Sequence, residues 1–498
     1  MILPKMRHSS AVLLTRGEGV ELEVFLVERA PELRFFGGFW ALPGGVVEGL
    51  DRRGETEIKL EISARSALRE LFEETGILAG SLAAAVAPKR RAELRAELLS
   101  SDAQGSRWWD LAGAVDRAVG DLRLICQFQT PLFAAVRHTT PFFHLHLPLG
   151  QEPVIERGEL VDGRFFRPED LVSAWRRGEL PVAPPVLYLL GMLRSGDLED
   201  FHRRAKEAGA AVAGGQLHRA RFSPGLMLAP LLTDTLPPAL TTNAIFVGEE
   251  RVYLVDPATT DPHEQERLFE TMGRWIAAGR KFLGLLLTHH HADHIGAVEA
   301  TARRFGLAVM AHPETLRRLE FLGAQDGVVL NHGDELDLGH SPDGRGGWRL
   351  AVHHTPGHAP GHLVFIENRY RAAIVGDMVS TLSTIVIDPP EGHMATYMAS
   401  LRYLKDQKIG TLYPAHGPAH IFGDDLLGQY IEHRAEREAQ LRLGLERGLA
   451  TLDELLAVVY SDTPRELHSV ARRSLLAGLI KLGEEGHGQA LSALESEK

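Results

Sequence analysis

Short apolar runs that end in polar residues dominate the second half of the chain. Their lengths are those of strands, and the residues that follow them include His, Asp, Thr, Gly and Pro. The predicted strands are residues 252–255, 282–287, 349–353, 372–375 and 409–412. Loops at the edge of a sheet converge on one place while the strands hold them rigid, so this pattern predicts a site at a sheet edge.

The densest group of polar residues, Thr288-His289-His290-His291-Ala292-Asp293-His294, directly follows the run 282–287. It places His289, His291, Asp293 and His294 within six positions. Imidazole nitrogen and carboxylate oxygen are the ligands that a borderline divalent ion such as zinc prefers. A merely polar turn is the alternative in a chain with 24 histidines. Four ligands at this spacing favour a metal site.

Later motifs continue the pattern, each after a predicted strand. They are Asp256, Thr355-Pro356-Gly357-His358, Val375-Gly376-Asp377 and Tyr413-Pro414-Ala415-His416-Gly417. With the His-x-His-x-Asp-His string, they resemble the metallo-β-lactamase superfamily. The resemblance implies an αββα sandwich that holds two zinc ions.

Carried over by position, the resemblance assigns His289, His291 and His358 to one zinc ion. It assigns Asp293, His294 and His416 to the other, with Asp377 bridging both. Two metals share a water, lower its pKa and stabilise a developing oxyanion, and Asp293 or Asp377 takes part in proton transfer. Four further histidines fall outside these ligand positions: His290, His353, His354 and His362.

The C-terminal part predicts a compact helical module of winged-helix size. A long helix is expected to begin with 429–434, followed by helices in 452–460, 463–470 and 474–486. With Pro389-Pro390-Glu391-Gly392, this order resembles the beta-lactamase-like protein 2 group, whose mitochondrial member is a single-stranded-RNA endonuclease. Residues 431–498 carry 9 Lys and Arg against 12 Asp and Glu. This excess of acidic residues disfavours binding of the module to duplex DNA and favours a role as a lid or packing module.

A second signature lies upstream, in Arg69-Glu70-Leu71-Phe72-Glu73-Glu74-Thr75-Gly76-Ile77. Helical spacing puts the three glutamates on one face, and Gly76 is placed to end the helix. Clustered carboxylates call for a hard cation, Mg²⁺ or Mn²⁺. The string resembles the core of the Nudix box, which implies an α/β/α sandwich that cleaves a pyrophosphate bond, with Arg69, Glu70, Glu73 and Glu74 as its working residues. An acidic, solvated helix face is the alternative.

The spacing departs from the usual box. Glu61 stands eight residues before Arg69, but the preceding Gly45 stands sixteen before Glu61, so about ten residues (49–58) are inserted and the role of Glu61 is in doubt. The insertion, a helical stretch at 90–119 and the run 175–188 resemble the coenzyme A diphosphatase branch. Glu159 is a candidate helper carboxylate or an ordinary strand residue.

Length and composition suggest three units. We expect a Nudix domain at 1–195, a linker without strong apolar periodicity at 196–222, a metallo-β-lactamase domain at 223–430 and the helical module at 431–498. The net charge of −12 disfavours nonspecific binding to nucleic acid or anionic membranes. The lone Cys126 excludes an internal disulfide framework and a thiolate-rich zinc site. The chain shows no leader and no long apolar run, so cytoplasm is the expected location.

The sequence therefore predicts a fused, bifunctional hydrolase. In one hypothesis, acyl-coenzyme A is the substrate of both domains: the Nudix domain cleaves its diphosphate and the metallo-β-lactamase domain its thioester. A second makes the C-terminal domain a single-stranded-RNA endonuclease and gives the Nudix domain nucleotides or RNA ends. A third makes one domain, more naturally the Nudix domain, a scaffold or sensor. Small nucleotide-like molecules or single-stranded RNA are thus the expected partners, and duplex DNA and membranes are not.

Overall fold

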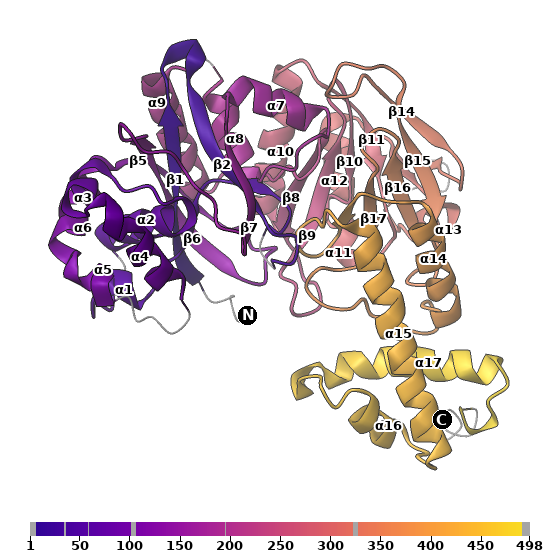
Figure 1. Ribbon diagram of the computed structural model, residues 1–498. Coiled ribbons are helices and arrows are strands. Elements are labelled where there is room, and N and C mark those ends of the chain that lie inside the picture. Colours follow the sequence, from indigo (N-terminus) through magenta and orange to yellow (C-terminus); the bar gives the residue numbers. More distant parts are fainter. Residues whose placement is uncertain are drawn as a thin grey trace. The chain divides into compact units, whose positions relative to one another are not determined.

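The computed structural model describes residues 6–33, 36–57, 59–100, 106–194, 196–321 and 327–490 (Figure 1). The chain divides into two compact units, the first formed by 1–132 and 136–222 and the second by 133–135 and 223–498. Residues 1–5, 34–35, 58, 101–105, 195, 322–326 and 491–498, which belong to segments named in the predictions, are outside the described residues. In the described part, no helix combines the length and the apolar character needed to cross a membrane.

The first unit is built on one mixed sheet of seven strands. In the order β3-β2-β1-β6-β5, β1 runs parallel to β6 and antiparallel to β2, while β4 pairs with β1 and β7 with β2. The strands are β1 (Met6–Arg16), β2 (Glu23–Arg29), β3 (Trp40–Ala41), β4 (Gly44–Val46), β5 (Arg123–Gln129), β6 (Arg137–His146) and β7 (Leu160–Phe166).

Helices cover both faces of this sheet, because alternate strand residues point to opposite sides and both sets are buried. Val12 and Phe143 pack in one core with Leu71 of α2. Cys126, on the other face, approaches Gly209 of α9. The α/β/α layering predicted for this half is therefore present. The helices are α1 (Gly49–Arg52), α2 (Leu60–Thr75), α3 (Gly80–Ala85), α4 (Pro88–Leu99), α5 (Ser106–Asp110), α6 (Ala112–Ala118), α7 (Pro168–Arg176), α8 (Pro184–Met192) and α9 (Leu198–Ala213), with 3-10 turns at Gly19–Glu21 and Val119–Asp121.

Helix α2 carries the glutamate-rich signature and ends as predicted. Gly76 adopts a left-handed backbone (φ 73°), and its N–H donates to the carbonyl of Phe72. A glycine reaches this conformation without the steric cost that a Cβ imposes. Helix α9 differs from the prediction, because it fills most of the expected linker. The small residues on its apolar face gave only weak hydrophobic periodicity in the sequence. Phe201 and Ala205 on that face are nevertheless fully buried.

The second unit contains two sheets. The first has the order β13-β12-β11-β10-β9-β8 and the second β14-β15-β16-β17-β18. Their strands are β8 (Leu226–Leu232), β9 (Thr241–Val247), β10 (Arg251–Val255), β11 (Lys281–Leu286), β12 (Val309–Ala311), β13 (Gly327–Val329), β14 (Glu335–Gly339), β15 (Trp348–His354), β16 (Leu363–Glu367), β17 (Ala372–Gly376) and β18 (Thr411–Pro414).

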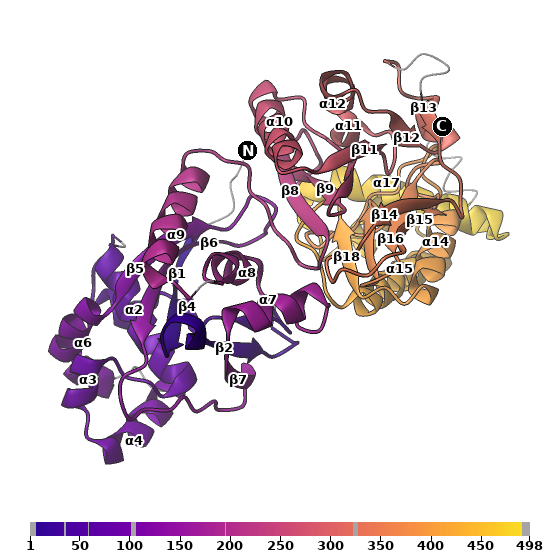
Figure 2. The same cartoon turned by 90° about the horizontal axis from the view of Figure 1, so that it is seen from above.

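Helices flank the outer face of each sheet (Figure 2). On the first sheet, Trp275 of α10 packs against Phe246, with ring centroids 4.9 Å apart. On the second, Val375 shares a core with Leu401 of α14 and Leu427 of α15. This is the predicted αββα arrangement. The helices are α10 (Pro262–Ala277), α11 (Ala292–Ile295), α12 (Val298–Phe305), α13 (Pro313–Leu316), α14 (Met394–Asp406) and α15 (Gly423–Glu446).

The C-terminal module consists of the end of α15, α16 (Leu452–Val459), a 3-10 turn (Arg465–Leu467) and α17 (His468–Glu484). Leu441, Leu455 and Leu479, one from each helix, meet in its core. Helix α15 begins at Gly423, earlier than predicted, and the last two predicted helices are largely one. A threonine cap with Glu454 three residues later starts α16.

Candidate functional sites

The predicted metal ligands all follow strand ends of the two facing sheets. His289, His291, Asp293 and His294 come after β11, His358 after β15, Asp377 after β17 and His416 after β18. The strands that precede these loops are largely buried, so the loops start from fixed points. This placement brings residues from different sheets to one edge, as the sequence pattern predicted.

His289, His291 and His358 form the first group. The Nε2 atoms of His289 and His358 each lie 3.0 Å from Nδ1 of His291. Three ring nitrogens therefore point at one small volume. Their ligand atoms all lie within 4.8 Å of one another.

Asp293, His294 and His416 form the second group, and their ligand atoms also lie within 4.8 Å of one another. Asp377 lies between the two groups. Its Oδ1 is 3.6 Å from Nε2 of His294 and 3.4 Å from Nε2 of His416, while its Oδ2 is 3.5 Å from Nε2 of His358. Asp377 would therefore reach an ion held by either group.

Two inward-facing atoms test whether these residues suit a metal. Nε2 of His294 and Oδ1 of Asp377 are buried and lack a hydrogen-bond partner among the described residues. Buried polar atoms are rarely left unpaired, because each one costs free energy. A cation between the two groups would satisfy both atoms, and nitrogen and carboxylate donors suit zinc. The residues therefore fit a pair of borderline divalent ions.

The outward nitrogens of three ligands are anchored by oxygen atoms. Nδ1 of His358 donates to the carbonyl of Val386 (2.9 Å) and Nδ1 of His416 to the carbonyl of Thr241 (3.0 Å). Nδ1 of His294 lies 2.9 Å from Asp256, which also accepts from the backbone N–H and hydroxyl of Thr288. With Nδ1 held by these oxygen atoms, each Nε2 faces the centre.

Burial shapes the charges of the site. It lowers the pKa of His358 to about 4 and that of His289 well below its ordinary value, which keeps both rings neutral. Burial acts to raise the pKa of Asp377, but the adjacent His416 and His294 outweigh it and hold that pKa well below its usual range. Burial acts to lower the pKa of His294 and of His416, but Asp377 outweighs it and raises both, so a bound metal would displace those protons.

Two residues outside the predicted ligand set contact it. His362 accepts a hydrogen bond from the backbone N–H of Asp377 (3.1 Å) and lies 3.0 Å from the hydroxyl of Thr355. Glu391 lies 3.1 Å from Nε2 of His290 and 3.5 Å from Nε2 of His291. Sequence reasoning missed Glu391, because nothing in its local pattern relates it to histidines far earlier in the chain.

The first unit brings the three glutamates of α2 to one largely buried face. Burial raises the pKa of Glu73 and of Glu74 to about 7 and that of Glu70 well above its ordinary value. Glu74 accepts a hydrogen bond from the N–H of Gly44 (2.8 Å), and Gly45 has no room for a Cβ beside the carboxyl of Glu70. The glycines thus let β4 approach the carboxylates.

Among the described residues, groups of three metal-ligand atoms within 4.8 Å occur in the second unit and not around these glutamates. The first unit therefore shows a carboxylate face rather than a closed ligand set. Glu159, the candidate helper, is exposed just before β7 and contributes to the raised pKa of Glu74, after burial.

Asp51, rather than Glu61, is the acidic partner of Arg69. Nε and Nη2 of Arg69 donate to its two carboxylate oxygens at 3.0 and 2.9 Å, and Glu61 is exposed. Asp51 stands six residues after Gly45, the separation expected of the missing glutamate. Within the predicted insertion at 49–58, residues 49–52 form α1.

Arg69 itself is 2% exposed, and its remaining donors reach Glu70, Glu73 and the carbonyl of Val46. Each of its three nitrogen atoms donates to the protein, so Arg69 orients these carboxylates. Its place among the catalytic residues stays a prediction.

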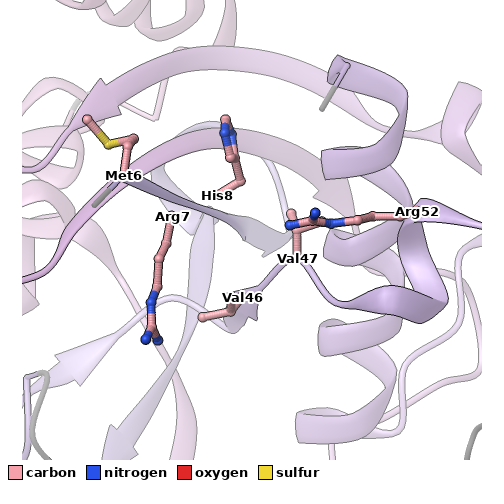
Figure 3. Close-up of a pocket in the computed structure, with 6 residues that line it drawn as sticks. All are labelled: Met6, Arg7, His8, Val46, Val47 and Arg52. Carbon is pink, nitrogen blue, oxygen red and sulfur yellow. The ribbon is translucent and has the colours of Figure 1, made fainter. Parts of the chain in front are cut away.

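A cavity of about 300 Å³ in the first unit is lined by Met6, Arg7, His8, Val46, Val47 and Arg52 (Figure 3). Within the described part of the chain, the Arg7 and Arg52 side chains form no ion pair. Val46 belongs both to the cavity wall and to the hydrogen bonds of Arg69. Arg7 and Arg52 thus give the cavity wall two positive charges.

Comparison with known proteins identifies the second unit. Residues 237–416 match the model of the metallo-beta-lactamase superfamily, and residues 451–487 match the beta-lactamase associated winged helix domain. The chain contains a metallo-beta-lactamase superfamily domain. The fold is thus a mixed α/β one with a C-terminal winged-helix domain, and hydrolysis is the general activity of this superfamily.

A curated relative is the beta-lactamase-like protein 2 homolog of Caenorhabditis elegans, 26% identical over 247 residues that cover 49% of this chain and 79% of the relative. A metallo-beta-lactamase family protein of Thermus thermophilus is 23% identical with a TM-score of 0.41, covering 53% of this chain and 97% of that one. A NUDIX hydrolase of Alicyclobacillus acidocaldarius is 26% identical with a TM-score of 0.34, covering 41% and 97%. The assignment of the first unit remains a proposal.

Proposed function

We propose that the metallo-beta-lactamase domain hydrolyses an ester or thioester at a dinuclear zinc centre. His289, His291 and His358 would hold one ion, Asp293, His294 and His416 the other, and Asp377 both. The observation that carries the proposal is the convergence of seven side chains. Two of them, His294 and Asp377, each present a buried atom that lacks a hydrogen-bond partner among the described residues. When bound, two such ions lower the pKa of a shared water and stabilise developing negative charge.

The chain's own residues supply position and proton handling. Carbonyl oxygens hold the rings of His358 and His416 in one tautomer, so their Nε2 atoms stay available. Asp293 is partly exposed, with its Oδ2 3.6 Å from Nε2 of His416. A partly exposed carboxylate at the rim of the centre is placed to receive a proton from the attacking water and pass it to the leaving group.

We further propose that the first unit cleaves a pyrophosphate bond in a nucleotide-like substrate, with Mg²⁺ or Mn²⁺ held by Glu70, Glu73 and Glu74. Three largely buried carboxyls on one helix face support this, since a hard cation would relieve their mutual repulsion. Arg7 and Arg52 suit the phosphates of such a substrate, and they line a cavity whose wall includes Val46, the partner of Arg69. Acyl-coenzyme A contains both a thioester and a diphosphate, which makes it the substrate class that suits both domains.

Single-stranded RNA is the competing substrate, favoured by the likeness to beta-lactamase-like protein 2 homologues. Purified full-length protein is incubated with acyl-coenzyme A and, separately, with end-labelled single-stranded RNA. The expected results are thiol release that His289→Ala abolishes and diphosphate cleavage that Glu73→Gln abolishes. If the protein cuts RNA, His289→Ala abolishes the cutting and no thiol is released, then the substrate bond of this domain is a phosphodiester and not a thioester.

A non-catalytic first unit is the remaining alternative. In that case diphosphate cleavage stays at background, and Glu73→Gln leaves it unchanged. Binding of duplex DNA is not expected, because the C-terminal module carries more acidic than basic residues.

A further inference from the structure

Residues 385–393, here called the bracing loop, join the region after β17 to α14 and contact the metal centre from one side. The carbonyl of Val386 accepts from Nδ1 of His358 (2.9 Å). Glu391 lies 3.1 Å from His290 and 3.5 Å from His291, both measured to Nε2. The backbone N–H of His393 donates to the carbonyl of Gly357 (2.7 Å), next to His358.

The opposite side of the bracing loop is held by helices of the C-terminal part of the chain. The N–H of Ile387 donates to the hydroxyl of Ser474 in α17 (3.2 Å). Arg473 pairs with Asp388 at 3.1 Å, and Arg434 of α15 donates to the carbonyl of Ile385. Some residues of the loop thus contact the helices, and others contact the metal ligands.

The geometry at Glu391 decides between a ligand and an orienting group. Nδ1 of His291 faces His289 and His358, so its Nε2 carries the proton in the neutral ring and donates outward. A protonated nitrogen does not bind a cation. Arg318 also donates to Oε1 of Glu391 at 3.0 Å, and its positive charge opposes a third ion at this place.

We propose that the bracing loop is a positioning segment for the metal centre, held in place by α17. Glu391 orients His291, and the carbonyl of Val386 orients His358. The proposal rests on the proposed metal binding of the second unit. It gives the winged-helix module a role that needs no nucleic acid, since its helix α17 supports two ligands of one metal through a single loop.

The test measures metal binding rather than turnover. Full-length Glu391→Ala, Glu391→Gln and Ser474→Ala are compared with the parent in competition for Zn²⁺ with a chromophoric chelator, and the Co²⁺-substituted proteins are compared by visible absorption. Glu446→Ala and Ser461→Ala are matched controls, because both residues are exposed and lie outside the bracing loop. Far-ultraviolet circular dichroism checks that each variant is folded.

Losing a carboxylate that orients a metal-bound histidine weakens metal affinity by about 10- to 100-fold. We expect Glu391→Ala to weaken the binding of one of the two ions by that factor and to change the Co²⁺ spectrum. Glu391→Gln retains an oxygen acceptor and should recover most of the affinity. Ser474→Ala should shift the spectrum in the same direction by a smaller amount, and both controls should match the parent.

Parental affinity and spectrum in Glu391→Ala would overturn the proposal. A third ion in the parent that Glu391→Ala alone removes would also overturn it, because Glu391 would then be a ligand. A parent that binds no Zn²⁺ would refute the proposed metal centre itself, which distinguishes the two failures. If Glu391→Ala does not fold, the decision falls to Ser474→Ala: a spectrum equal to that of Ser461→Ala would refute the brace.

Discussion

Removing the carboxylate of Asp51 should destabilise the first unit strongly, whereas removing that of Glu61 should not. Asp51 is 1% exposed and accepts two hydrogen bonds from Arg69, which is 2% exposed. Breaking a buried ion pair by deleting one partner costs about 3–5 kcal/mol, because the other charge stays buried. Arg69 keeps Glu70, Glu73 and the Val46 carbonyl, so we expect the lower end, about 3 kcal/mol.

For a unit of this size, each kcal/mol shifts the midpoint of thermal unfolding by about 2–4 °C, so Asp51→Ala should lower it by about 6–12 °C. Thermal unfolding of the full-length protein measures the shift, and hydrogen–deuterium exchange of peptides from α2 assigns it to the first unit. Asp51→Asn, which keeps the shape but loses the charge, should fall between parent and Asp51→Ala.

Two controls make the result decisive. Glu61 is exposed, and Asp116 is half exposed in its pairs with Arg53 and Arg65. Exposed ion pairs contribute about 0–1 kcal/mol, so Glu61→Ala and Asp116→Ala should each shift the midpoint by a few degrees at most. An equal shift for Asp51→Ala and Glu61→Ala would refute the reassignment of the acidic partner.

Three further predictions follow from the two sites. His289→Ala should lose at least one of two zinc ions and all hydrolysis by the second unit, as measured by atomic absorption and thiol release, and retained turnover would contradict the site. Burial raises the pKa of Glu73 and Glu74 to about 7 from an ordinary 4.5. In EDTA, their contribution to the stability of the first unit should therefore be fully present below pH 4.5 and be lost as the pH rises through 7, and Mg²⁺ should reduce that loss. The same pH profile in the parent and in Glu73→Gln would show that Glu73 makes no such contribution. Arg7→Ala and Arg52→Ala should each raise KM for a diphosphate substrate about tenfold, the loss of a charge-assisted hydrogen bond, with kcat little changed; an unchanged KM would place the phosphates elsewhere.

The sequence revealed those features whose residues lie close together in the chain. The His-x-His-x-Asp-His string and the glutamates of α2 can each be recognised within seven consecutive positions. His358, Asp377 and His416 became visible because each follows an apolar run that forms a strand. The αββα layering was predicted through the same motifs, because the resemblance that they carry implies it.

Features that depend on distant partners could not be predicted. Asp51 was overlooked because an aspartate was not sought where a glutamate is usual, and only the bonds of Arg69 identify it. Helix α9 was missed because its buried stripe contains alanine and glycine, which carry little hydrophobic signal. Glu391 approaches its histidines across the fold, so no local spacing relates them.

The anchors of the metal ligands show why a ligand string alone does not define a metal centre. His358 and His416 are fixed by the backbone carbonyls of Val386 and Thr241, and any amino acid offers a carbonyl. These anchors therefore have no sequence signature and depend only on where the backbone runs. The backbone next to Val386 is in turn held by Ser474, far along the chain in α17. A domain cut before α17 would keep every predicted ligand and lose this support, so the centre is a property of the whole second unit.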